Sequence, residues 1–285
     1  MVLGFFQSIF ILISFRPQVV FSKGGYVSLP VVFAAFLMRI PIILHESDSR
    51  MGLTNRLTAR MAKIVCVAFE DLLQGKKYHL TGNPIRSDIL NGEAKKGYQL
   101  TGFNDKMPVL LVWGGSQGAQ QINQLLMADL EQFTSCFQVI HVTGKGKCEV
   151  RGARCDEDSN AALRTPHSAL KNYISFEYLG NELRDIYAIT DLMIGRAGAN
   201  SLFEIAALQK PNIIIPLLNS DQQNNARYFE KKKAALVYQK GDNLFEMTLD
   251  LWQNKALRSQ MRKALKELSH PHAAEEIATL VTNYE

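Results

Sequence analysis

The sequence has few cysteines, and none of them are arranged in pairs. The four cysteines, Cys66, Cys136, Cys148 and Cys155, form no CxxC motif, and the six histidines are scattered along 285 residues. These spacings indicate neither a zinc site nor a disulfide framework. Reduced thiols of a cytosolic protein are the better interpretation. We therefore expect no metal and no other cofactor.

The sequence also lacks a long apolar run and a strong charge imbalance. The uncharged start, MVLGFFQSIFILISF, has neither the basic beginning nor the cleavage site of a signal peptide. As a helix it would reach about 22 Å, short of the roughly 30 Å hydrocarbon core of a bilayer, so we expect a core helix exposed by a truncated beginning and not a membrane anchor. The net charge of +5 fits phosphate-bearing substrates or an anionic membrane surface. No basic stripe interleaved with aromatics indicates nucleic-acid binding.

Short apolar runs are followed by helical patterns throughout the chain. Residues 18–21, 41–44, 64–68 and 109–113 are runs of this kind, and each ends at glycine or at polar residues. Repeated strand, loop and helix units are typical of a parallel sheet with helices on both faces. The fold class is therefore α/β, with doubly wound domains.

The composition sets the expected domain boundaries. A chain of this length that is 47% apolar and 21% charged suits two globular domains. A polar, glycine-containing stretch separates the two series of strands and helices, and we place the linker there. The expected segments are a first domain at 1–90, a linker at 91–106, a second domain at 107–243 and a helical tail at 244–285.

Two glycine turns between a strand and a helix are candidate phosphate sites. In WGGSQGA at 113–119, Gly115 and Ser116 precede a helix whose free N–H groups attract anions, and SKGGY at 22–26 repeats this arrangement. A tight turn needed only for packing explains WGGSQGA equally well. Because GGSQGA lacks GxGxxG spacing and no acidic residue ends the next strand, NAD binding is disfavoured.

Polar side chains near the ends of later strands could bind a sugar nucleotide. Glu204, in RAGANSLFEIAAL at 196–208, could accept hydrogen bonds from the two hydroxyls of a ribose, although a solvated helix residue is the default interpretation. Gln222 and Gln223, in DQQNNA, can both donate to and accept from sugar hydroxyls.

An earlier strand ends in His45 and Glu46, closely followed by Asp48. Active sites of α/β proteins usually lie at such strand ends. A lone His-Glu pair, however, is more often structural than catalytic, so both interpretations stay open at this point.

Six motifs in a fixed order resemble the MurG family of glycosyltransferases, in glycosyltransferase family 28. They are FSKGGYVSLP at 21–30, HESDSRMGLTN at 45–55, GNPIR at 82–86, WGGSQGA at 113–119, RAGANSLFEIAAL at 196–208 and DQQNNA at 221–226. The resemblance covers essentially the whole chain. It implies a GT-B fold, in which two Rossmann-like domains face each other across a cleft and the chain end returns to the first domain. It also implies an N-terminally truncated first domain, because the family's opening strand and Gly-rich, His-containing loop have no counterpart before Met1.

The resemblance further implies an inverting transfer of N-acetylglucosamine from UDP-N-acetylglucosamine to an undecaprenyl-linked muramoyl-peptide, as in bacterial peptidoglycan synthesis. The acceptor hydroxyl would attack the anomeric carbon, and UDP would leave without help from a metal. The family works at the cytoplasmic face of the cell membrane, so peripheral association with the inner leaflet is implied as well. Two alternatives remain: a catalytically impaired UDP-sugar-binding fragment, and an enzyme like the UDP-N-acetylglucosamine 2-epimerases.

The resemblance also assigns residues to the two substrates. Glu204 matches the ribose ligand, Gln222 and Gln223 the pair that holds the donor sugar, and Gly180 the position where uracil is read through the backbone. The full implied donor set is Arg86, Gly115, Ser116, Gly180, Ala199, Glu204, Gln222 and Gln223. The implied acceptor set is Gly24, Gly25, Tyr26, His45 and Asp48.

The catalytic base is the least defined part of this assignment. The family's candidate histidine lies in the Gly-rich loop that has no counterpart here, and Glu46 or Asp48 could take its role. Asp48 also departs from the commoner family pattern, which has Asn at this position.

Overall fold

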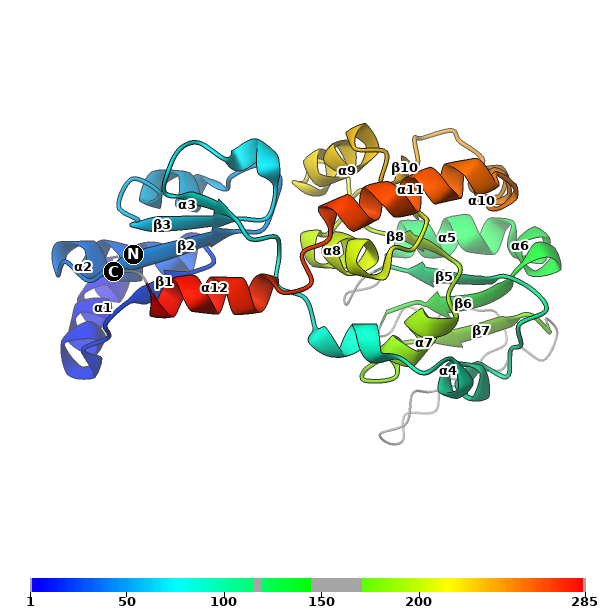
Figure 1. The fold of residues 1–285 in the computed structure, drawn as a ribbon, viewed down its shortest axis with the longest axis horizontal. Coiled ribbons are helices and arrows are strands. Elements are labelled where there is room, and N and C mark those ends of the chain that lie inside the picture. Colours follow the sequence, from blue (N-terminus) through cyan, green and yellow to red (C-terminus); the bar gives the residue numbers. More distant parts are fainter. Residues whose placement is uncertain (1, 115–118, 145–170, 284–285) are drawn as a thin grey trace. The chain divides into compact units, whose positions relative to one another are not determined.

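The computed structural model describes residues 2–114, 119–144 and 171–283. They divide into two compact units, each with its own parallel sheet (Figure 1). Unit 1 consists of Met1–Ile85 and His270–Glu285, and unit 2 consists of Arg86–Ser269.

Unit 1 is built on four parallel strands in the order β1-β2-β3-β4. The strands are β1 (Val20–Ser22), β2 (Ile42–Glu46), β3 (Ile64–Val67) and β4 (Tyr78–Leu80). The helices are α1 (Val2–Phe15), η1 (Tyr26–Ser28), α2 (Leu29–Leu37), α3 (Leu53–Thr58), η2 (Glu70–Leu72) and α12 (Ala273–Thr282).

Side chains of the central strands alternate between two buried layers. Ile42 and Leu44 of β2 pack into one cluster with residues of α1 and α2. Ile43 and Cys66 face the other way and pack against Ile277 of α12. Because both faces are covered, the strands are apolar at successive positions, which explains the continuous runs seen in the sequence.

Unit 2 has six parallel strands in the order β10-β9-β8-β5-β6-β7. They are β5 (Val109–Trp113), β6 (Gln138–Val142), β7 (Tyr173–Phe176), β8 (Leu192–Gly195), β9 (Asn212–Ile214) and β10 (Leu236–Val237). The chain first builds outward from β5 on one side and then returns to start again with β8 on the other. This is the strand order of the Rossmann fold, and its topological switch point lies between β5 and β8, where ligands commonly bind.

Helices surround the sheet of unit 2. They are η3 (Ser87–Asn91), α4 (Ala94–Thr101), α5 (Gln120–Ala128), α6 (Leu130–Cys136), α7 (Leu183–Ile189), α8 (Ala199–Leu208), α9 (Gln222–Lys231), α10 (Leu244–Gln253) and α11 (Lys255–Leu268). Helix α4 packs on α7, α11 on α8, and α10 on α5 and α6. The helical tail predicted from the sequence is therefore divided, because α10 and α11 belong to unit 2 and α12 to unit 1.

The boundary between the units lies before Arg86, earlier than the linker predicted at 91–106. Much of that stretch is helix α4, which packs against α7. The backbone N–H of Glu93 also donates to the Asp185 carboxylate of α7 at 2.8 Å. Only Gly97 and Thr101 of α4 are buried, which is why this short surface helix resembles a linker in composition.

Helix α1 leaves most of its apolar surface exposed. It buries only Ser8 and Leu12, while Phe6 and Phe10 are 63% and 75% exposed. The helix is therefore buried along one narrow face only. Among the described residues, no helix is long and apolar enough to cross a membrane.

Candidate functional site

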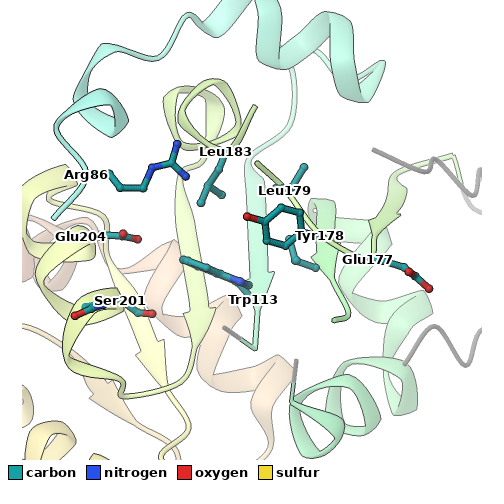
Figure 2. Close-up of a pocket in the computed structure, with 10 residues that line it drawn as sticks. Arg86, Trp113, Glu177, Tyr178, Leu179, Leu183, Ser201 and Glu204 are labelled. Carbon is teal, nitrogen blue, oxygen red and sulfur yellow. The ribbon is translucent and has the colours of Figure 1, made fainter. Parts of the chain in front are cut away.

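A cavity of about 230 Å³ lies at the carboxyl edge of the unit 2 sheet (Figure 2). Trp113 ends β5 and lines it, and Trp113 is paired in register with Gly195 at the end of β8. The cavity thus lies beside the switch point of the fold. Its lining residues are Arg86, Trp113, Val142, Glu177, Tyr178, Leu179, Leu183, Asn200, Ser201 and Glu204.

Glu204 projects into this cavity from the second turn of α8. Its side chain is buried, and the hydroxyl of Tyr187 donates to Oε2 at 3.0 Å. Burial raises the pKa of Glu204, while the bond from Tyr187 and the charge of Arg86 lower it. Burial and the nearby carboxylate raise the pKa of Tyr187 well above its usual value, so the phenol stays protonated as the donor. Oε1 accepts no hydrogen bond from the described residues, which leaves it available to a ligand.

Arg86 lies at the rim of the same cavity. Its guanidinium donates to Asp88 at 2.7 and 3.1 Å, to the Gly180 carbonyl at 3.4 Å and to the Asn181 side chain at 3.3 Å. The hydrogen bond to Asp88 raises the pKa of Arg86, and the same bond lowers the pKa of Asp88. The guanidinium of Arg86 can donate hydrogen bonds to phosphate oxygens, while the carboxylate of Glu204 accepts hydrogen bonds from hydroxyls.

Gly180 uses both of its backbone groups within the protein. Its N–H donates to Glu182 at 3.2 Å, and its carbonyl accepts from Arg86. A base read through this backbone would have to replace one of these bonds. Gly180 does not line the cavity itself, although Leu179 does.

Sequence reasoning missed the aromatic residues of this site. Trp113 and Tyr178 line the cavity, and Tyr187 supports Glu204 from behind. The Trp113 and Tyr187 rings are 6.2 Å apart between centroids and tilted by 59°. The position of Trp113, at a strand end directly before GGSQGA, is the signal that could have identified it.

Of the remaining predicted donor residues, those that the structure describes do not line the cavity. Ala199 begins α8 immediately before two lining residues. Gln222 and Gln223 begin α9, where the backbone N–H of Leu217 donates to Gln222 Oε1 at 3.1 Å, and neither glutamine lines this cavity. Gly115 and Ser116 lie outside the described residues.

In unit 1, two predicted acceptor residues, His45 and Asp48, take part through backbone groups in a hydrogen-bond network around Glu46 at the end of β2. Both oxygens of the buried Glu46 carboxylate accept: Oε1 from the N–H of Asp48 at 3.1 Å, and Oε2 from the N–H of Gly52 at 2.9 Å and from the Asn55 amide at 3.0 Å. The Asn55 amide also donates to the His45 carbonyl at 3.1 Å. Glu46 therefore ties the loop after β2 to the start of α3.

His45 is fully buried beneath this loop. Its Nε2 lies 3.0 Å from the Gly82 carbonyl, so Nε2 carries the proton, and Nδ1 accepts from Ser47 at 3.4 Å. Burial lowers the pKa of His45 to about 4. A neutral imidazole with both nitrogens bonded inside the protein is well suited to holding the loop.

The glycine turn after β1 lies beside the same network. Gly24 and Gly25 have φ angles of +85° and +83°, which only glycine adopts without strain. A Cβ on Gly24 would lie 2.7 to 2.9 Å from the Asn55 side chain, so β1 and α3 approach each other closely here. Tyr26 follows and is 77% exposed.

Neither site resembles a metal centre. In residues 2–114, 119–144 and 171–283, no group of three or more His, Cys, Asp and Glu side chains is arranged to hold a metal ion.

Two domain models of glycosyltransferase family 28 match the chain. The C-terminal domain matches residues 109–277, and the N-terminal domain matches residues 1–67. A Legionella pneumophila (strain Paris) protein named UDP-N-acetylglucosamine–N-acetylmuramyl-(pentapeptide) pyrophosphoryl-undecaprenol N-acetylglucosamine transferase is 42% identical over 280 residues, covering 93% of this chain and 72% of the relative. A Clostridium botulinum (strain Loch Maree / Type A3) protein of the same name is 38% identical over 284 residues, covering 93% of this chain and 76% of the relative.

Solved structures share the fold. The Acinetobacter baumannii MurG structure has a TM-score of 0.75 at 24% identity, covering 98% of this chain and 77% of that one. A Neisseria meningitidis UDP-GlcNAc 2-epimerase bound to UDP-GlcNAc has a TM-score of 0.69 at 14% identity, covering 98% of this chain and 80% of that one. At such identities the likeness concerns the fold alone, and it confirms the predicted GT-B class of two Rossmann-like domains.

The resemblance inferred from six motifs is confirmed by these matches. The domain models together match most of the chain, and the 38 to 42% identities to the named transferases extend over 93% of it. The predicted enzyme class, a glycosyltransferase, is confirmed with them. The chain belongs to the MurG family of glycosyltransferase family 28.

Proposed function

We propose that the chain transfers N-acetylglucosamine from UDP-N-acetylglucosamine to a muramyl-pentapeptide carried on pyrophosphoryl-undecaprenol. The observation that carries this proposal is the buried Glu204 carboxylate, which keeps one oxygen directed to a cavity that Arg86 also lines. That pairing suits a nucleoside diphosphate, which has a ribose diol and phosphates. The names of the Legionella and Clostridium relatives supply the sugar and the acceptor.

In this proposal, unit 2 binds the donor. Glu204 accepts hydrogen bonds from the ribose hydroxyls, and Arg86 releases part of its contact with Asp88 to bind the diphosphate. Gln222 and Gln223, at the start of α9, contact the sugar. As the acceptor hydroxyl attacks the anomeric carbon, negative charge moves to the departing UDP, and stabilising that charge is the main contribution of the protein.

Unit 1 binds the acceptor in the same proposal. The turn at Gly24 and Gly25 faces the lipid diphosphate, with Tyr26, His45 and Asp48 nearby in the chain. Of the two candidate bases we favour Asp48, because it is only half-buried, whereas the Glu46 carboxylate is buried and ties the loop together through three donors. Glu46 and His45 then act as positioning residues that hold the Asp48 loop.

We also propose that unit 1 associates with the cytoplasmic face of the membrane. Leu3, Phe6, Phe10 and Ile13 lie on one side of α1 at helical spacing and are 55 to 79% exposed. An apolar helix face together with a net charge of +5 favours an anionic lipid surface. Sedimentation with anionic phospholipid vesicles tests this, since Phe6→Ser combined with Phe10→Ser should abolish co-sedimentation that the unaltered chain shows.

The direct test of the transferase is UDP release by the purified chain. UDP-N-acetylglucosamine is supplied with and without a short-chain analogue of the lipid acceptor, and donor binding is measured by calorimetry in parallel. Acceptor-dependent release supports the proposal. Donor binding without release in the presence of acceptor contradicts it for this chain, and acceptor-independent conversion to UDP-N-acetylmannosamine would identify an epimerase instead.

A further inference from the structure

Trp113 stands out in a strand that is otherwise a typical buried one. The four preceding residues of β5, Val109–Val112, are aliphatic and 0% exposed. Trp113 is the fifth residue, is only partly buried and lines the cavity. An aromatic ring this large at the mouth of the site contributes flat apolar area where a ligand would lie.

Neighbouring side chains hold the indole in place. Its ring contacts that of Tyr187, with 6.2 Å between centroids, and the Tyr187 hydroxyl is bonded to Glu204 at 3.0 Å. The position of the indole is therefore tied to the position of the carboxylate. Figure 2 shows the Trp113 ring lying between Glu204 and Tyr178 across the cavity.

The covalent structure of a nucleoside connects the expected roles of Glu204 and Trp113. The base and the two hydroxyls are attached to one furanose ring, so a ribose bonded to Glu204 brings its base into the same small cavity. Besides Trp113, the apolar lining there consists of aliphatic side chains, Val142, Leu179 and Leu183, and the ring of Tyr178. Of the two aromatic rings, Tyr178 is 53% exposed, whereas the indole is the one coupled to Glu204 through Tyr187.

We infer that Trp113 is the platform on which the nucleobase of the donor stacks. The inference rests on the proposed binding of a UDP sugar in this cavity. A π face accepts any base, so Trp113 supplies affinity, and discrimination between bases falls to polar groups at the rim. Base-aromatic stacking of this kind is worth about tenfold or more in affinity.

The chain offers an internal reporter for this contact. It has two tryptophans, and Trp252 on α10 packs against Phe137 and lies 4.5 Å from the guanidinium of Arg258, with no part in lining the cavity. In a Trp252→Phe variant, all tryptophan fluorescence therefore comes from Trp113. We expect UDP to quench that emission, with the same dissociation constant that calorimetry gives.

Two substitutions separate stacking from folding. Trp113→Leu should weaken UDP binding about tenfold or more, whereas Trp113→Phe, which keeps an aromatic face, should stay within about threefold of the unaltered chain. Thermal unfolding of each variant checks that the unit remains folded. If Trp113→Leu does not fold, the quenching experiment and Trp113→Phe still decide the question.

The outcomes separate this inference from the proposed function. UDP binding by calorimetry with unchanged Trp113 emission would overturn the stacking role and leave the donor site intact. Equal losses in Trp113→Phe and Trp113→Leu would also overturn it, because loss of the aromatic face would then not be the cause. A chain that binds no UDP at all would overturn the proposed function, and the inference with it.

Discussion

Each unit places a glutamate at the carboxyl edge of a parallel sheet, but the two glutamates are used in opposite ways. Glu46 in unit 1 accepts three hydrogen bonds from Asp48, Gly52 and Asn55. Glu204 in unit 2 accepts one bond among the described residues, from Tyr187, and faces a cavity. The same residue type therefore holds a loop in place in unit 1 and has an oxygen available for a ligand in unit 2.

The difference shows that a position at the carboxyl edge of a sheet does not by itself identify a functional residue. A carboxylate whose two oxygens both accept hydrogen bonds stabilises the loop around it, and its removal leaves buried N–H groups without acceptors. A buried carboxylate with an unused oxygen is destabilising unless a ligand satisfies it. Hydrogen-bond satisfaction, which the sequence does not reveal, thus separates the two roles.

The largest expected effect is the loss of unit 1 stability in acid, caused by His45 beneath the Glu46 loop. The pKa of His45 falls from 6.5 to about 4 on folding, because burial disfavours the charged ring. The unfolded chain therefore takes up the proton first, and stability present above pH 6.5 is lost as the pH falls toward 4, by about 3 kcal/mol for this one group. Both tryptophans belong to unit 2, so tryptophan fluorescence does not report on unit 1. The stability of unit 1 is therefore measured by amide hydrogen exchange of β2.

Two substitutions test whether His45 is the source of this acid sensitivity. His45→Gln should flatten the decline of unit 1 stability between pH 6.5 and 4. His272→Gln alters an exposed histidine of the same unit and should leave the decline unchanged. An undiminished slope in His45→Gln would show that another group governs the acid response.

The next largest effect is expected on catalysis when the Glu204 carboxylate, which faces the cavity, is replaced. Glu204→Gln keeps the shape but removes the charge that would bind the ribose diol, so we expect kcat/KM for the donor to fall about 10- to 100-fold. The stability of unit 2 should change little or increase at neutral pH, since burial raises the pKa of Glu204 and makes the ionised form costly. Steady-state kinetics and fluorescence-detected unfolding measure the two quantities.

Glu230→Gln on α9 is the matched control for charge, because Glu230 is exposed and lies outside the cavity lining. It should leave kcat/KM within about twofold. Comparable losses in both variants would argue against a ligand role for Glu204.

Substitutions of Gly24 and Gly25 test the packing around Asn55, which donates to Glu46. Gly24→Ala and Gly25→Ala both place an alanine at a positive φ, which is strained at either position. A Cβ at Gly24 would also strike Asn55 at 2.7 to 2.9 Å, whereas one at Gly25 meets nothing within 4 Å. We expect Gly24→Ala to destabilise unit 1 by about 1 kcal/mol more than Gly25→Ala in hydrogen exchange of β2. Equal effects would mean that Asn55 moves aside without weakening its bonds to Glu46.

The smallest effect on stability is expected for the Arg86–Asp88 ion pair at the rim of the cavity in unit 2. Arg86 and Asp88 form an ion pair at 2.7 Å, but their side chains are 42% and 37% exposed. Asp88→Asn should therefore change the free energy of unfolding by less than about 0.5 kcal/mol. Chemical denaturation monitored by tryptophan fluorescence would reveal a larger loss, which would mean that the pair is a structural element of unit 2.

Much of the fold could be predicted from the sequence, because buried parallel strands are continuously apolar. The predicted strand at 109–113 coincides with β5, and those at 41–44 and 64–68 overlap β2 and β3. Strands β4 and β10 were not predicted, since they are three and two residues long and lie at sheet edges, where packing leaves little pattern.

The site was less predictable than the fold. Resemblance identified Glu204, but its hydrogen bond comes from Tyr187 on the preceding helix, and no spacing rule indicates that contact. Trp113 meets Tyr187 only because β5 and α7 pack in one unit. Contacts of this kind depend on tertiary packing and are absent from local sequence pattern.

Helix α12 also determines the order in which the protein can be completed during synthesis. Unit 2 is inserted between two segments of unit 1, and Ile277 of α12 covers Ile43 and Cys66 on one face of the first sheet. At a translation rate of 5 to 20 residues per second, that face waits about 10 to 40 seconds for its cover after Ile85 has been made. The strands of unit 1 are thus made before unit 2 and covered after it, so this apolar face is exposed to aggregation in the nascent chain during that interval.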